Sequence, residues 1–273
     1  MTVEQPVFCV SDHTGLTAEG LAHSIMARFE SVRPRYRVHP FVAGAEHAES
    51  IAAEINRLAD EGRPPIIFTT LVDPVTRKIL ADSKGIVVGS YDEVVEAVGE
   101  ILGIEPSLRV GGYHGISNLH SYQVRIDALD FALATDDGIG LSRYPSADVV
   151  LMGVSRVGKT PTCLYLSMHF GIRAANYPIA PEDLAKPGLP DALGAHRDRL
   201  FGLTVTPQRL HEIRRRRRPD SDYASVDTCL SEIAATERIY RDFGIEYLDS
   251  TNLSVEEIAV ILMRQAGIER RIE

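Results

Sequence analysis

Short apolar runs and amphipathic stretches alternate along the first hundred residues. The apolar runs lie at 6–10, 65–72 and 85–90, and the stretches with helical spacing lie at 16–29, 48–59 and 91–102. In the first of these helices, Leu21, Ile25 and Phe29 recur at helical spacing. Short strands that alternate with helices are typical of an α/β sheet. The pattern predicts an N-terminal α/β domain over residues 1–105.

A different composition follows this first domain. The stretch "GIEPSLRVGGYHGISN" is rich in glycine and polar residues, and a helix with Tyr122, Ile126, Leu129 and Leu133 on one face comes after it. We therefore expect a linker and connecting helix over residues 106–146.

The α/β alternation resumes in the second half of the chain. The run "DVVLMGV" precedes a glycine-containing loop and a helix that ends at Gly171, and strands are expected within 199–205 and 244–250. Ser254 and Glu257 have the spacing of a capping box at the start of the last helix. Residues 147–273 are predicted to form a P-loop kinase-like α/β domain.

The loop of this second domain matches the phosphate-binding pattern G-x-x-x-x-G-K-[ST]. Its glycines allow backbone N–H groups to wrap phosphate oxygens, the lysine meets the terminal phosphates, and the hydroxyl is a ligand for Mg²⁺. The strand before it and the helix after it fit, since a helix N-terminus attracts anions. The predicted nucleotide-binding residues are Gly153, Val154, Ser155, Arg156, Val157, Gly158, Lys159 and Thr160, with Thr160 as the metal ligand.

The loop alone leaves open whether the protein is a kinase, an ATPase or a GTPase. The usual second signal is an apolar strand downstream that ends in an acidic Mg²⁺ ligand. The best match is Asp249, in a strand interrupted by Glu246, and no N-K-x-D motif for guanine is present. The phosphate machinery is therefore expected to be atypical.

Charge and composition narrow the range of partners. The net charge of −9 disfavours nucleic acid as a partner. No secretory signal and no apolar run of membrane-spanning length is found, so we expect a cytoplasmic protein with no membrane contact. The three cysteines lack the spacing of a disulfide framework or a zinc site.

Two further loops contain residues suited to catalysis. Asp136 and Asp137 follow a helix in "ATDDG", where they either belong to a helix end capped by Gly138 or have a metal or acid/base role.

In "SDHTG", Ser11 and Thr14 could hold an anion while Asp12 or His13 acts on a proton. The alternative for this loop is turn chemistry with Thr17 as a helix cap.

A run of five arginines, Arg214 to Arg218, stands at the expected end of a helix that begins at Thr206 and Pro207. Cations stabilise the C-terminal end of a helix, so a solvated helix end is one interpretation. The other is a mobile arginine segment that pairs with phosphates or with an acidic protein surface.

Several of these stretches resemble one family over nearly the whole chain. The fragments are "GVSRVGKTPTCLYL", "GIRAANYPIAPEDL", "LFGLTVTPQRLHEIRRRRRPDSDYAS", "LDSTNLSVEEIA", "VSDHTGLTAE" and "FALATDDG". They are similar to the phosphoenolpyruvate synthase regulatory proteins, which belong with the pyruvate, phosphate dikinase regulatory proteins among the bifunctional kinase/phosphorylases. The "GKT" loop resembles the synthase-directed branch.

The resemblance implies two opposed reactions on a threonine of phosphoenolpyruvate synthase or, alternatively, of pyruvate, phosphate dikinase. ADP donates its β-phosphate to inactivate the target, and inorganic phosphate removes it again with release of pyrophosphate. Mg²⁺ is an expected cofactor, and a homodimer is compatible with the resemblance. Lys159, Asp136, Asp137 and Asp12 are the expected catalytic residues, and Ser11, Thr14 and Arg156 are expected to bind phosphate.

Two other classes of protein share the loop. A small-molecule P-loop kinase would transfer phosphate to a metabolite without any protein acceptor. A nucleotide-dependent binding switch would bind the nucleotide without transfer.

Overall fold

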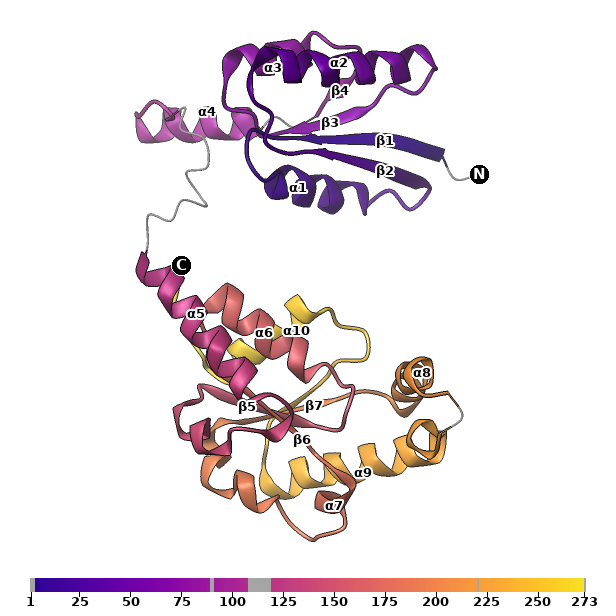
Figure 1. Cartoon of the computed structure of the whole chain (residues 1–273), viewed down its shortest axis with the longest axis vertical. Coiled ribbons are helices and arrows are strands. Elements are labelled where there is room, and N and C mark those ends of the chain that lie inside the picture. The colour runs from indigo at the N-terminus through magenta and orange to yellow at the C-terminus, as the bar shows by residue number, and fades with distance from the viewer. Residues whose placement is uncertain (1–2, 89–90, 108–118, 220, 273) are drawn as a thin grey trace. The chain divides into compact units, whose positions relative to one another are not determined.

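The computed structural model describes residues 3–88, 91–107, 119–219 and 221–272. The chain divides into two compact units, residues 1–115 and 116–273. Each unit has one parallel four-stranded sheet with helices packed against it (Figure 1). The predicted α/β class is therefore confirmed in both halves.

The sheet of the first unit has the strand order β2-β1-β3-β4. Its strands are β1 (Val3–Val10), β2 (Val32–His39), β3 (Ile66–Thr69) and β4 (Ile86–Val87), and the helices are α1 (Leu16–Met26), α2 (Gly44–Asp60), α3 (Pro74–Ala81) and α4 (Tyr91–Leu102). Alternate residues of β1 belong to different cores: Val7 and Cys9 pack with α1, whereas Phe8 and Val10 pack with α2 and α3. Figure 1 shows these helices on opposite faces of the sheet.

Two features of the first unit did not follow from the sequence pattern. The helix α1 buries Ala18, Ala22 and Met26. Of the three apolar residues at helical spacing, Ile25 packs against the same core, whereas Leu21 and Phe29 are exposed. The strand β2 was not predicted, because its sequence "VRPRYRVH" places arginines among its apolar residues. It forms an edge of the sheet, where such charged residues remain in contact with solvent.

The sheet of the second unit has the order β6-β5-β7-β8. Its strands are β5 (Val149–Gly153), β6 (Ala174–Pro178), β7 (Leu200–Thr204) and β8 (Tyr247–Asp249). The α-helices are α5 (Leu119–Ala134), α6 (Lys159–Phe170), α7 (Pro181–Leu184), α8 (Pro207–Arg217), α9 (Val226–Phe243) and α10 (Val255–Gln265). Short 3₁₀ helices are η1 (Asp136–Gly138), η2 (Leu141–Ser146), η3 (Asp191–Arg199) and η4 (Asp222–Ala224).

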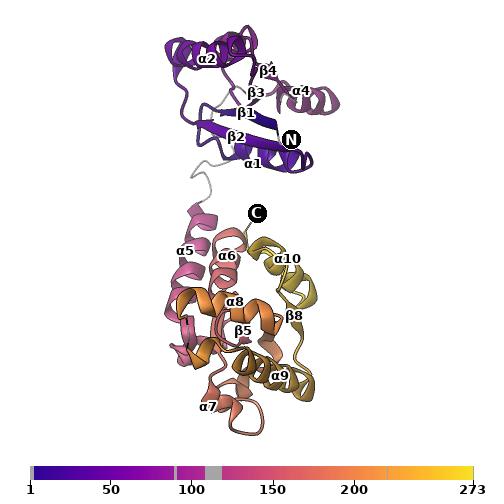
Figure 2. The same cartoon turned by 90° about the vertical axis from the view of Figure 1, so that its right-hand side faces the viewer.

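Helices cover both faces of this second sheet. Figures 1 and 2 show α5, α6 and α10 on one face and α7 and α9 on the other. Along β5, Val149 and Leu151 belong to the core with α6 and α10, and Val150 and Met152 belong to a core with α9. The strand β5 is thus buried on both sides, as a central parallel strand is expected to be.

The helix α5 belongs to the second unit, so the boundary between the units divides the segment predicted as linker and connecting helix. Its buried residues are Ala128, Phe131 and Ala132. Tyr122 and Leu133 are exposed, and the apolar face predicted for this helix is wrong. The shorter side chains of the alanines allow α5 to pack closely on α6.

Several predicted helix ends are confirmed. Gly171 ends α6 in the left-handed conformation, Pro207 opens α8, and Ser254 and Glu257 form both bonds of the capping box of α10. None of the helices within the described residues is long and apolar enough to cross a membrane.

Candidate functional site

The glycine loop, residues 153–160, connects the carboxyl end of β5 to α6. At Gly153, a Cβ would lie 2.5 Å from the carbonyl oxygen of Leu203, so no other residue fits there without a backbone shift. Gly158 has a φ of 96° and precedes the first turn of α6. The two glycines of the motif are therefore both required by the conformation of the loop.

Arg156, in the middle of this loop, also has a left-handed backbone, with a φ of 86°. A non-glycine residue adopts this conformation at an energetic cost, and such strain is concentrated at functional sites. Its side chain is exposed, so the guanidinium is accessible to an anion from solvent.

Lys159 is buried, and its side chain folds back onto the glycine loop. Its Nζ donates to the carbonyl oxygens of Gly153 and Val154, both at 2.9 Å. Burial lowers the pKa of Lys159 to about 8, while the nearby carboxylates of Asp137 and Asp136 oppose this shift. The loop carbonyls thus hold an ammonium group that a bound anion could attract away from them.

Asp136, Thr160 and Asn176 meet beside the lysine. The hydroxyl of Thr160 donates to Asp136 Oδ1 at 2.8 Å, and Asn176 Nδ2 donates to the same oxygen at 2.5 Å and to Thr160 Oγ1 at 2.9 Å. Asn176 is 1% exposed, and its Oδ1 has no hydrogen-bond partner among the described residues. The carboxylate of Asp136 and the hydroxyl of Thr160 are oxygen donors of the kind that Mg²⁺ prefers, and the amide N–H groups of Asn176 position both of them.

The two aspartates of "ATDDG" have different surroundings. Asp136 is held by Thr160 and Asn176, whereas Asp137 is exposed and has a left-handed backbone with a φ of 51°. The helix α5 ends at Ala134, and Gly138 lies in the following 3₁₀ turn. Gly138 is therefore not the residue that caps α5, and that alternative is wrong.

The acidic residue beside Thr160 comes from upstream of the glycine loop. Asp249, the best downstream match in the sequence, lies at the end of β8 and accepts a hydrogen bond from the backbone N–H of Thr251 at 2.9 Å. Its described bonds stabilise the turn after β8.

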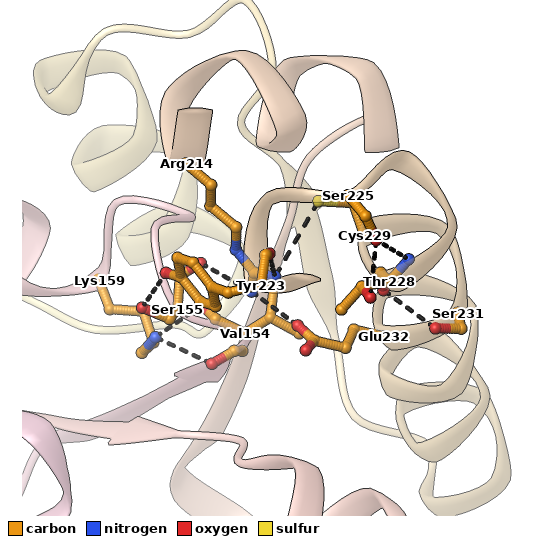
Figure 3. A network of polar contacts seen from close by, with 11 residues as sticks. Val154, Ser155, Lys159, Arg214, Tyr223, Ser225, Thr228, Cys229, Ser231 and Glu232 are labelled. Atoms are coloured by element: carbon orange, nitrogen blue, oxygen red, sulfur yellow. Dashed lines mark hydrogen bonds and ion pairs between the residues drawn. The ribbon is translucent and has the colours of Figure 1, made fainter. Parts of the chain in front are cut away.

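The first arginine of the basic run is buried against the glycine loop. Arg214 is 1% exposed and donates to Ser155 O at 3.3 Å, to Tyr223 O at 3.0 Å and to Glu232 Oε2 at 2.6 Å. Its guanidinium lies 4.1 Å from the centre of the Tyr223 ring, and the Tyr223 hydroxyl donates to Ser155 Oγ at 3.0 Å. Figure 3 shows Arg214 between the loop and Glu232 of α9. These contacts fix Ser155, the residue that precedes the strained Arg156.

The other arginines of the run do not share this environment. Arg215, Arg216, Arg217 and Arg218 are all exposed. The interpretation of the run as a solvated helix end is therefore correct for four of its five arginines.

The "SDHTG" loop lies in the first unit, at the carboxyl end of the central strand β1. Ser11 Oγ accepts hydrogen bonds from the backbone of His13 and from the Thr70 hydroxyl, and Asp12 Oδ2 accepts from the backbone of Val72 at 2.7 Å. The helix α1 begins at Leu16 after Gly15 with no side-chain cap, so the alternative of a Thr17 cap is wrong. Thr14 is partly exposed in the same loop.

The structure places the predicted residues in two groups. Gly153 to Thr160, Asp136 and Asp137 lie together in the second unit, and Ser11, Asp12 and Thr14 lie together in the first. Within the described residues, no group of three or more His, Cys, Asp or Glu side chains could hold a metal ion by itself. Cys9, Cys163 and Cys229 are buried free thiols.

Sequence reasoning missed Asn176, Tyr223 and Glu232 as parts of the site. Asn176 lies in "AANYP", whose small residues and proline do not have the pattern of a strand. An asparagine directly after a short apolar segment, in a second strand beside the loop, was the one available signal.

Comparison with known proteins identifies the family. The model of the kinase/pyrophosphorylase family matches residues 7–263. Three similar proteins each bear the name "Putative phosphoenolpyruvate synthase regulatory protein". They come from Bordetella pertussis, with 41% identity over 98% of both chains, from Neisseria meningitidis serogroup C, with 40% identity over 99% of this chain and 100% of the relative, and from Deinococcus radiodurans, with 43% identity over 96% of both. The chain belongs to the kinase/pyrophosphorylase family.

Proposed function

We propose that this protein is a bifunctional regulator of phosphoenolpyruvate synthase, which phosphorylates a threonine of that enzyme with ADP and removes the phosphate by phosphorolysis. The observation that carries the proposal is the arrangement of Lys159, Thr160 and Asp136 around one end of the glycine loop. Family membership supports phosphotransfer, and the names of the relatives support the synthase as the target.

The glycine loop and Lys159 would bind the phosphates of ADP. The backbone N–H groups at the start of α6 carry the positive end of the helix dipole, which would attract the phosphates. Lys159 would exchange its bonds to Gly153 and Val154 for the β-phosphate, and Arg156 would reach the same group from solvent. These contacts stabilise the negative charge that is transferred.

Mg²⁺ fits beside these residues. Thr160 and Asp136 would hold it through oxygen atoms, directly or through water, and Asn176 would position them. When bound, the metal would neutralise charge on the phosphate oxygens.

Asp137 is the better placed of the two aspartates to act as the base. Asp136 already accepts two hydrogen bonds, whereas Asp137 is exposed and close enough to Lys159 to affect its pKa. Asp137 would accept the proton of the threonine hydroxyl while that oxygen bonds to the β-phosphorus and AMP departs with the bridging oxygen.

The reverse regulation needs inorganic phosphate as a second substrate. Phosphate attacks the phosphothreonine, which restores the hydroxyl and releases pyrophosphate. We keep Ser11 and Thr14 as the proposed anion site for this reaction, with Asp12 as its acid/base group. The test is a Thr14→Val variant, which should lose phosphorolysis while it retains ADP-dependent transfer; equal loss of both activities would refute this assignment.

The experiment for the main proposal compares donors and acceptors in one assay. The protein is incubated with Mg²⁺ and either ADP or ATP, and with purified phosphoenolpyruvate synthase, pyruvate, phosphate dikinase or no protein acceptor. We expect phosphothreonine to form on the synthase when ADP is the donor and not when ATP is the donor. Phosphorylation of the dikinase in place of the synthase would show that the dikinase is the target. Phosphorylation of a metabolite in a cell extract that lacks both enzymes would favour a small-molecule kinase.

A further inference from the structure

A cavity lies in the same unit as the glycine loop, at the carboxyl ends of β7 and β8. It has a volume of about 570 Å³, within the range of small-molecule sites. Its lining comes from the start of α8 and from the turn between β8 and α10: Thr206, Gln208, Arg209, Glu212, Thr251, Asn252, Leu253 and Ser254. Both segments follow the carboxyl ends of strands, which is the edge where ligands of open α/β sheets bind.

Hydrogen bonds connect this cavity to the glycine loop. The hydroxyl of Ser250, which precedes the lining residue Thr251, donates to Val157 O at 3.0 Å and to Thr204 O at 3.1 Å. The backbone N–H of Thr206 donates to Thr251 Oγ1 at 2.8 Å, which joins the two lining segments. The cavity is therefore held in a fixed position relative to the loop.

The strand order places this cavity and the acidic cluster on opposite sides of the loop. Asn176 lies on β6, one neighbour of β5, and it holds Asp136. The cavity lies at the carboxyl ends of β7 and β8, on the other side of β5. A nucleotide with its terminal phosphate at Lys159 and Thr160 would direct its nucleoside away from the carboxylates, and this cavity is on that side.

The lining has the chemistry that a nucleobase requires. Gln208 and Asn252 are exposed and carry amide donors and acceptors suited to the edge of a base. Arg209 is exposed, and its planar guanidinium can stack on the face of a base. Pyrophosphate lacks a base and a ribose, so pyrophosphate held at Lys159 would not extend to these side chains.

We propose that the cavity between α8 and the β8–α10 turn binds the base and ribose of the nucleoside diphosphate. This inference rests on the proposed function, because it assumes that the glycine loop holds the phosphates. It assigns to Arg209 and Asn252 a role in distinguishing a nucleotide from a simple polyphosphate.

The test measures the affinities of ADP and pyrophosphate separately by titration calorimetry with Mg²⁺. The double variant Arg209→Ala/Asn252→Leu should bind ADP roughly tenfold more weakly, as loss of about 1.4 kcal/mol of base contacts would produce. Its affinity for pyrophosphate should stay within about twofold of the wild-type value. Arg238→Ala, a change of the same charge at an exposed position on α9, is the matched control and should alter neither affinity.

Three results would contradict the account in distinguishable ways. Unchanged affinity for ADP in the double variant, or an equal loss for ADP and pyrophosphate, would overturn the nucleoside site alone. Failure of the wild-type protein to bind either ligand would overturn the proposed function and the nucleoside site with it. Because both substituted side chains are exposed, the variants should retain the thermal unfolding profile of the wild type.

Discussion

Asp136 accepts hydrogen bonds from Thr160 and Asn176 through a single carboxylate oxygen. Asp136→Asn preserves the size of the side chain but removes its charge. We expect phosphotransfer to fall by about 10²- to 10³-fold, since a preorganised charge beside the transferred group is lost. Initial rates with ADP and Mg²⁺ measure this effect.

The control for this variant is Asp242→Asn, on α9. Asp242 is exposed and belongs to neither proposed site, so its variant should retain the wild-type rate within a few-fold. An Asp136→Asn protein as active as the wild type would remove Asp136 from the proposed mechanism.

Two arginines of the basic run are expected to contribute differently to the stability of the protein. Arg214→Ala should lower the free energy of unfolding by about 3 kcal/mol, because it leaves the carboxylate of Glu232 without its buried partner. Arg216→Ala should change it by less than about 0.5 kcal/mol, since Arg216 is exposed. Urea denaturation of both variants makes the comparison, and equal effects would show that the Arg214–Glu232 contact contributes little.

Part of this site could be predicted from the residue types and their spacing in the sequence. The motif located the glycine loop, and Asp136 and Asp137 were selected because carboxylates after a helix conflict with its dipole. The pairing of Asp136 with Thr160 depends on how α5, β6 and α6 pack, and no local pattern encodes that. The same holds for Arg214, which is one of five identical residues in the sequence but the one that reaches Ser155.

At the scale of elements, the capping box of α10 makes a measurable contribution. Ser254 Oγ accepts from the backbone of Glu257 at 3.2 Å, and Glu257 accepts from the backbone of Ser254 at 2.8 Å. Ser254→Ala should therefore cost about 1 kcal/mol of stability. Val260→Ala on the exposed side of the same helix should cost less than about 0.5 kcal/mol, and the two variants are compared by chemical denaturation.

Sequence patterns predicted the central strands better than the edges. The strands β1, β3, β5 and β7 are apolar because they are buried, and each was predicted. The edge strands β2 and β6 were missed because one contains arginines and the other contains alanines and proline. In α1 and α5, larger apolar residues suggested one face, but close packing favoured the alanines.

At the scale of the whole molecule, the proposed kinase residues belong to one unit and the proposed phosphate site of the reverse reaction to the other. The resemblance covers both units, and the family match spans both as well. The net charge of −9 gives no general attraction to polyanions, so phosphate binding depends on local groups such as Lys159 and Arg156.

The most direct test of the central claim follows the β-phosphate of ADP. Wild-type protein and a Lys159→Met variant are incubated with Mg²⁺, purified phosphoenolpyruvate synthase and ADP labelled at either the α- or the β-phosphorus. We expect label on a synthase threonine from β-labelled ADP with the wild type alone, and α-label recovered in AMP. A synthase that stays unlabelled with β-labelled ADP, or that is labelled equally by the Lys159→Met variant, would contradict the account.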